Sequence, residues 1–262
     1  MSLASTPATQ AIAAALCGGF VSFSLGLVGG GGSILAVPLI LYVVGVHNPH
    51  IAIGTAALAV AASAYINMIP HARAGHVRWG PAFAFAASGV LGATLGSTVG
   101  KLVDGQKLLT YFAFLMCFVA FLMLRPRPSA TATAGANPTP YPRLCGTGLG
   151  AGGLSGFFGI GGGFLVVPGL MFAGRMQIVD AIGTSLFAVG SFGLTTAINY
   201  SLSGQVDWLV AAEFVGGGVV GGLLGTQAAS RLARKRGALN RVFSAMIISV
   251  AAYMLYHSWQ AR

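Results

Sequence analysis

The sequence contains one arrangement of short motifs twice, and this duplication limits the folds that the chain can adopt. The matched pairs are GLVGGGGS at 26–33 with GFFGIGGG at 156–163, AIGT at 52–55 with AIGT at 181–184, and GHVRW at 75–79 with GQVDW at 204–208. Their separations are 130, 129 and 129 positions. A constant separation over about 100 residues indicates one structural unit built twice.

The scarcity of charge places both units in a membrane. Only 7% of the 262 residues are charged and 55% are hydrophobic, whereas soluble domains average about 25% charged residues. The 14 Lys and Arg residues outnumber the 4 Asp and Glu residues. Because the basic residues lie in short loops between apolar runs, we interpret them as determinants of membrane orientation and not as a nucleic-acid surface.

Each copy contains five apolar segments. They lie at about 9–28, 33–46, 52–70, 79–100 and 107–124 in the first copy, and at about 144–158, 164–174, 180–200, 208–230 and 238–257 in the second. Between them, residues 125–143 contain five prolines and no apolar run, which prevents a continuous helix. The predicted organisation is a first membrane repeat (1–124), a Pro-rich cytoplasmic linker (125–143) and a second membrane repeat (144–262).

The segment that follows each glycine cluster is too short to cross a bilayer comfortably. The segment at 33–46 would be only ~21 Å long as a helix, against a hydrocarbon core of about 30 Å. We therefore predict an all-α, polytopic membrane protein whose two repeats each have a glycine-broken, re-entrant helical hairpin plus three spanning helices.

The basic residues favour an inverted relation between the repeats. If each copy crosses an odd number of times, 11 basic residues fall on one side and 3 on the other, whereas parallel copies would divide them 8 to 6. The three are Lys101, Lys107 and Arg262. The positive-inside rule prefers the inverted arrangement, which is common in secondary transporters.

The glycine clusters and nearby polar residues are the candidate substrate site. Irregular backbone in a membrane survives where it is buried or lines a cavity, and a helix that starts there attracts anions. Hydroxyl and amide groups could bind an oxyanion, although they could instead bond neighbouring helices. The candidates are Gly29, Gly31, Gly32, Ser33, Thr55, Asn67, Gly159, Gly161, Gly162, Gly163, Thr184, Ser185 and Asn199.

Several other features have two interpretations. Glu213 could carry a coupling proton or reach the outer interface. His71, Arg73, His76 and Arg78 could attract anions or simply set topology. Small residues recur every four positions from Ser88 to Gly100 and from Gly217 to Ala229, which is typical of close helix packing.

Enzymatic and metal-dependent functions find little support. The GLSG at 153–156 resembles the nucleophile motif of rhomboid proteases, but the late histidine, His257, does not lie where it could serve Ser155 as a base. The three cysteines show no CxxC spacing, and no histidine or carboxylate cluster suggests a metal. We therefore predict no catalytic residues, no cofactor and no metal site.

The paired motifs GLVGGGGSILAVP and GFFGIGGGFLVVP, with AIGT in each half, GHVRW and GQVDW, resemble the sulfite exporter TauE/SafE family, also described as the toluene-sulfonate uptake permease group. The resemblance covers nearly the whole chain apart from the linker and the first few residues. It implies a multi-pass protein of the bacterial inner membrane that transports sulfur-containing anions, such as sulfite or organosulfonates. The first copy departs from the second at Ser33, which matches Gly163, and at Gly30, which matches Ile160.

The expected function is a secondary transporter of small sulfur-containing anions, bound near the bilayer centre at the two glycine breaks. A channel or carrier for another solute or a metal ion is the alternative, followed by an intramembrane serine protease. The expected partners are the anionic substrate and lipid, with a coupling proton or ion and a homo-oligomer left open.

The charge count predicts that both termini lie outside the cytoplasm. Reporter fusions at each end, active only on one side of the membrane, measure this directly. A cytoplasmic signal from either terminus would contradict the inverted arrangement.

Overall fold

The computed structural model describes residues 7–124, 141–161 and 163–232, which form helices joined by short loops, with no strand among them. The helices are α1 (Pro7–Val28), η1 (Gly29–Leu35), α2 (Ala36–Leu39), η2 (Ile40–Val44), α3 (Pro49–Arg73), α4 (Trp79–Leu102), α5 (Gly105–Leu124), α6 (Tyr141–Phe158), α7 (Gly163–Ala173), α8 (Ile178–Ser201) and α9 (Trp208–Leu232). The all-α prediction is confirmed. The predicted segment at 238–257 and linker residues 125–140 lie outside the described residues.

Five of the described helices are long and apolar enough to cross a membrane. They are the segments Pro7–Leu27, Pro49–Arg73, Trp79–Leu102, Val179–Ser201 and Trp208–Gln227. Large apolar side chains such as Leu16, Leu95 and Leu209 are exposed on these helices, as expected where the surrounding solvent is lipid. The chain is therefore a multi-pass membrane protein.

The segment after the first glycine cluster differs from the expected single helix at 33–46. It consists of the 3₁₀ turn η1, the short helix α2 and the π-helical turn η2. Pro38 explains part of the irregularity, because proline removes one backbone donor and its ring crowds the carbonyl four residues earlier. A left-handed glycine, Gly45 (φ 85°), ends the segment.

The second hairpin is more regular. α6 and α7 match the predicted segments at 144–158 and 164–174 within three residues. α6 already includes Tyr141, Pro142 and Arg143, which the sequence analysis assigned to the linker. A proline near the first residue of a helix is well tolerated, because its missing N–H would have had no partner within the helix.

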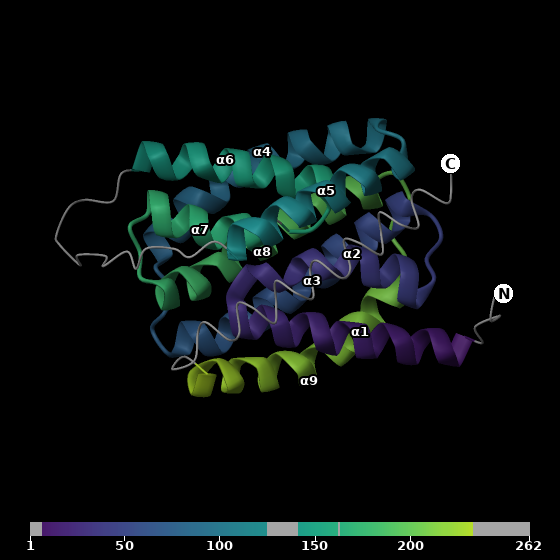
Figure 1. Cartoon of the computed structure of the whole chain (residues 1–262), viewed down its shortest axis with the longest axis horizontal. Helices are drawn as coiled ribbons and strands as arrows, with labels where there is room; N and C mark the ends of the chain where they lie inside the picture. The colour runs from purple at the N-terminus through teal and green to yellow at the C-terminus, as the bar shows by residue number, and fades with distance from the viewer. Residues whose placement is uncertain (1–6, 125–140, 162, 233–262) are drawn as a thin grey trace.

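The most extensive packing joins helices of different copies. α1 lies beside α9, and α4 lies beside α6, on opposite sides of the bundle (Figure 1). Glycines allow these contacts: a Cβ on Gly221 would meet the backbone of Gly19, and a Cβ on Gly92 would meet the backbone of Leu149. The predicted small-residue packing is confirmed at these positions, and the two copies are interlocked.

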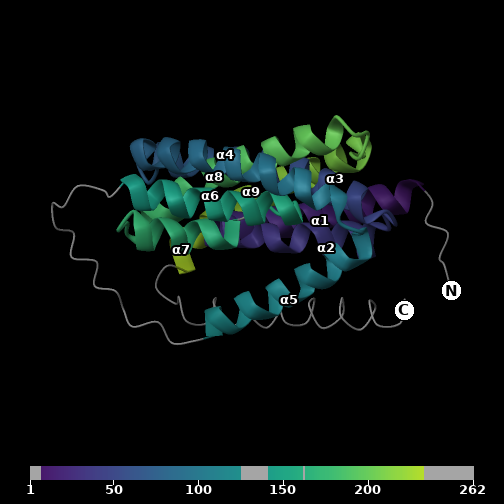
Figure 2. The same ribbon diagram turned by 90° about the horizontal axis from the view of Figure 1, so that it is seen from above.

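α3 and α8 form the centre of the bundle and are the corresponding helices of the two copies. They pack side by side and run in opposite directions, since Gly54 contacts Tyr200 near one end and Tyr65 contacts Gly190 further along. α5 lies at the edge of the bundle (Figure 2), where Phe112 contacts Phe158 of α6 at a ring separation of 5.6 Å.

The glycine contacts make a stability prediction. In Gly221→Ala the new methyl group would press on the backbone of Gly19, and such overpacking lowers stability by about 1–3 kcal/mol. Gly216 of the same helix has nothing within 4 Å of an added Cβ, so Gly216→Ala is the matched control. We expect only Gly221→Ala to lower the melting temperature in detergent, and equal melting temperatures would contradict this packing.

Candidate functional site

The two glycine segments meet inside the bundle. A Cβ on either Gly30 or Gly163 would overlap the backbone of the other glycine, so these two backbones are in direct contact. Gly161 lies beside them, and its Cβ would be 2.9 Å from Val60 and 3.1 Å from Val189. Val60 and Val189 are equivalent positions near the middle of α3 and α8. The glycine contact therefore lies at mid-depth in the bundle.

Three glycines in these segments have backbone conformations that other residues rarely adopt. The φ angles are 72° at Gly29, 67° at Gly159 and 66° at Gly161. A side chain at Gly29 would also meet Ser185 Oγ at 3.0 Å, and one at Gly159 would overlap Ile53. The turns thus require glycine both for conformation and for space.

Ser185 is the predicted side chain that reaches the first glycine segment from the other copy. Its hydroxyl donates to the carbonyl of Ile182 at 2.7 Å and accepts from the backbone N–H of Gly30 at 3.4 Å. Ser33 serves its own turn, because its hydroxyl donates to the Gly30 carbonyl at 2.8 Å. Gly31 and Gly32 are buried in the same turn. Gly162 lies outside the described residues.

Thr55 and Thr184 play equivalent roles away from the glycine contact. The backbone N–H of Asp207 donates to the Thr55 hydroxyl at 2.9 Å, and that of Arg78 donates to the Thr184 hydroxyl at 3.0 Å. Each threonine is fully buried and fixes the loop before α9 or α4. The neighbouring Gly54 and Gly183 permit this approach, since a Cβ on either would meet a loop carbonyl.

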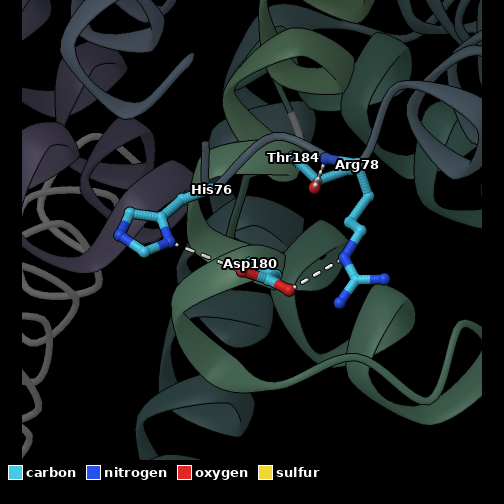
Figure 3. A network of polar contacts seen from close by, with 4 residues as sticks. All are labelled: His76, Arg78, Asp180 and Thr184. Carbon is cyan, nitrogen blue, oxygen red and sulfur yellow. Dashed lines mark hydrogen bonds and ion pairs between the residues drawn. The ribbon is translucent and has the colours of Figure 1, made fainter. Parts of the chain in front are cut away.

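An ion-pair network joins the two copies beside Thr184. Asp180, in the first turn of α8, lies 2.9 Å from Arg78 Nε and 3.5 Å from His76 Nδ1 (Figure 3). The sequence analysis proposed that His76 and Arg78 either attract anions or set the membrane topology, but it did not name Asp180. The sequence did contain one indication of its role, because Asp180 stands where the first copy has the apolar Ile51.

The two predicted asparagines do not lie at the glycine contact. Asn67 donates to the Ser22 carbonyl at 3.2 Å. Asn199 lies near the other end of α8, where its side-chain amide donates to Ser97 Oγ at 2.6 Å. Lys101, which the sequence analysis did not assign to a site, donates to Asn199 Oδ1 at 2.7 Å and to Ser203 Oγ at 2.9 Å.

The described residues contain neither a grouped set of metal ligands nor a base paired with Ser155. Within them, no three His, Cys, Asp or Glu side chains are grouped to hold a metal ion. The Ser155 hydroxyl is buried without a hydrogen-bond partner, whereas a serine nucleophile needs a base within reach. His257 lies outside the part of the chain that the structure describes.

The paired threonines predict equivalent losses of stability. Thr55→Val and Thr184→Val each leave a loop N–H without its acceptor, at a cost of about 1–3 kcal/mol. Thr195→Val is the control, because the Thr195 hydroxyl only donates to Ser191 of its own helix. Thermal unfolding in detergent should show both losses and no loss for the control. A stable Thr184→Val variant would contradict the assigned bond.

Comparison with known proteins agrees with this architecture. Residues 14–254 match the protein family described as "Sulfite exporter TauE/SafE". A "Probable membrane transporter protein" of Xylella fastidiosa (strain 9a5c) is 55% identical over 246 residues, covering 92% of this chain and 94% of the relative. The "Probable membrane transporter protein YunE" of Bacillus subtilis (strain 168) is 26% identical over 261 residues, covering 91% and 95%. No solved structure matches. The chain therefore belongs to the sulfite exporter TauE/SafE family and is a membrane transporter.

Proposed function

We propose that the protein is a secondary transporter of small sulfur-containing anions, such as sulfite or organosulfonates, and that the anion binds where the two glycine segments meet. The observation that carries this proposal is the contact of Gly30 with Gly163 at mid-depth, flanked by Val60 and Val189. Transporters commonly bind substrate near the bilayer midplane, between two structural repeats, at interrupted helices.

The chemistry at this contact suits an anion. Glycine turns expose backbone N–H groups, and the Ser185 hydroxyl lies within hydrogen-bonding distance of the Gly30 amide. The chain's four acidic residues all lie away from the contact, near the ends of helices: Asp104, Asp180, Asp207 and Glu213. A fixed negative charge would repel an anion, so the absence of one at this contact supports anion binding.

The repeats are proposed to be inverted with respect to the membrane. The opposite directions of α3 and α8, which are corresponding helices, support this arrangement. Two oppositely oriented units around one central site provide for alternating access, in which one side of the site opens as the other closes.

The polar contacts at the two ends of α8 are the proposed gates, which open or close the path from the substrate site to either side of the membrane. One end is held by Asp180 to Arg78 and His76. At the other end Lys101 holds Asn199 and Ser203. Both sets of contacts are present in the same structure, and in this proposal their joint presence defines the conformation closed at both ends. Opening the site to one side would require the polar contacts at that end of α8 to break.

The membrane potential determines which direction of transport needs coupling. Moving one elementary charge across 100 mV changes the free energy by about 2.3 kcal/mol. An inside-negative potential therefore drives a divalent anion such as sulfite outward without further coupling. Uptake against that potential would require coupling to protons or another ion.

Uptake of radiolabelled sulfite into proteoliposomes, with a fixed potential and pH gradient, tests the proposal. We expect saturable flux that small sulfonates inhibit. Ser185→Ala should lower the flux about ten-fold, since removing one hydrogen bond to a substrate-site amide changes binding by roughly that factor.

Ser201→Ala, near the end of the same helix, is the matched control and should transport normally. Flux that is unchanged in Ser185→Ala would place the site elsewhere. An absence of sulfite flux under every gradient would remove sulfite as substrate and direct the assay to organosulfonates and other solutes.

A further inference from the structure

A cluster of buried oxygen atoms lies between α1, α3 and α9, on the first copy's side of the bundle. It comprises Ser22 of α1 and Ser63 and Asn67 of α3, with relative exposures of 0%, 2% and 2%. These side chains face Gly218 and Gly222, one turn apart on α9. Because both facing residues are glycines, α9 contributes no side chain to the layer in which the oxygens lie.

The two serine hydroxyls have no hydrogen-bond partner. A Cβ built on Gly218 would be 2.6 Å from Ser22 Oγ and 3.1 Å from Ser63 Oγ, with the Gly18 carbonyl oxygen at 3.5 Å. Both hydroxyl oxygens thus lie close to one point, yet neither is satisfied by the protein. Burying an unpaired hydroxyl in an apolar interior is unfavourable. Ser22 and Ser63 differ from a single buried serine in that two unpaired hydroxyls lie close together, and this pairing points to a shared ligand.

Asn67 turns its amide oxygen toward α9. Its amide nitrogen donates to the Ser22 carbonyl at 3.2 Å, which fixes the orientation of the side chain. Its Oδ1 consequently contacts the position of Gly222. The two serine oxygens and the Gly18 carbonyl oxygen lie around Gly218, and Asn67 Oδ1 lies one helical turn further along α9, beside Gly222. Uncharged oxygens of this kind suit a cation more than an anion.

The second copy lacks this set of side chains. The positions corresponding to Ser22, Ser63 and Asn67 are Gly152, Phe192 and Thr196. There the ring of Phe192 packs against Gly89, the counterpart of Gly218. The first copy thus packs serine oxygens against Gly218, where the second copy packs an aromatic ring against Gly89.

The cluster is close to the proposed substrate site. Ser63 lies about one helical turn from Val60, which contacts Gly161. Ser22 lies on α1 ahead of the turn that begins at Gly29. A ligand held here would be coupled to the same helices that bear the glycine contact.

We propose that Ser22, Ser63 and Asn67 form a binding site for a monovalent cation of the size of Na⁺, which accompanies the anion. The coupling rests on the proposed function, whereas the site itself does not. Na⁺ has nearly the radius of Ca²⁺, which takes oxygen ligands at about 2.3–2.6 Å. Neutral ligands suit a single charge, since divalent ions in proteins usually recruit carboxylates.

The test compares the purified full chain in NaCl with the chain in choline chloride and KCl of equal ionic strength. We expect Na⁺ to raise the melting temperature of the wild type in a saturable way. Ser22→Ala and Ser63→Ala should each increase the half-saturating Na⁺ concentration about ten-fold, as expected for loss of one ligand. Ser155→Ala, which deletes another buried and unpartnered serine hydroxyl, should behave as the wild type.

Sulfite flux into proteoliposomes, measured with and without Na⁺, separates the two proposals. Flux that does not depend on Na⁺, in a protein that Na⁺ does not stabilise, would overturn the cation site and leave the transporter assignment intact. Na⁺ stabilisation that is lost in Ser63→Ala, without any sulfite flux, would support the cation site and overturn sulfite as the substrate. Equal Na⁺ effects in Ser63→Ala and Ser155→Ala would also overturn the site.

Discussion

Close contact between helix backbones of different copies is the interaction on which the rest of this structure depends. Lipid chains are as apolar as leucine, so burying leucine provides little force for helix association in a membrane. Contacts such as Gly221 with Gly19 and Gly92 with Leu149 replace that force with dense packing of backbone atoms. They fix α1 to α9 and α4 to α6, and these two pairs enclose α3 and α8. The central helices therefore take their positions from both copies.

The irregular glycine segments leave backbone N–H and C=O groups without helical partners, and a few side chains form hydrogen bonds with these groups. Backbone groups freed from a helix are expensive to bury without partners. Ser33 donates to the Gly30 carbonyl, and Ser185 accepts from the Gly30 amide. One turn of the first copy is thus completed by a serine from the second. A substrate that competes for these groups would act on both copies at once.

Much of the fold could be predicted from the sequence, because apolar runs and repeated motifs report directly on helices in lipid. α3, α4, α8 and α9 lie within three residues of the predicted segments. The subdivision into η1, α2 and η2 could not be predicted, since it depends on how Pro38 and the glycines pack locally. The repeat also paired Thr55 with Thr184 correctly, and the structure gives them matching bonds.

The candidate site was less predictable, because the two copies have diverged in their polar residues. Asp180 and Lys101 have partners that lie about 100 residues away along the chain, and no motif reports such pairs. Asn67 and Asn199 were chosen for being polar within apolar segments, yet one bonds a neighbouring backbone and the other a lysine. The unpartnered Ser22 and Ser63 are ordinary helical serines by sequence. Only the opposing Gly218 distinguishes them.

The pairing of α1 with α9 also constrains how the protein is made. α1 is the first described helix to be synthesised, and α9 follows roughly 180 residues later. At about 5–20 residues per second, the ribosome needs on the order of ten to forty seconds to supply the partner of α1. During that interval the glycine face of α1 must rest against lipid, or against a temporary protein neighbour in the insertion machinery. The native pair can form only when the second copy has nearly been completed.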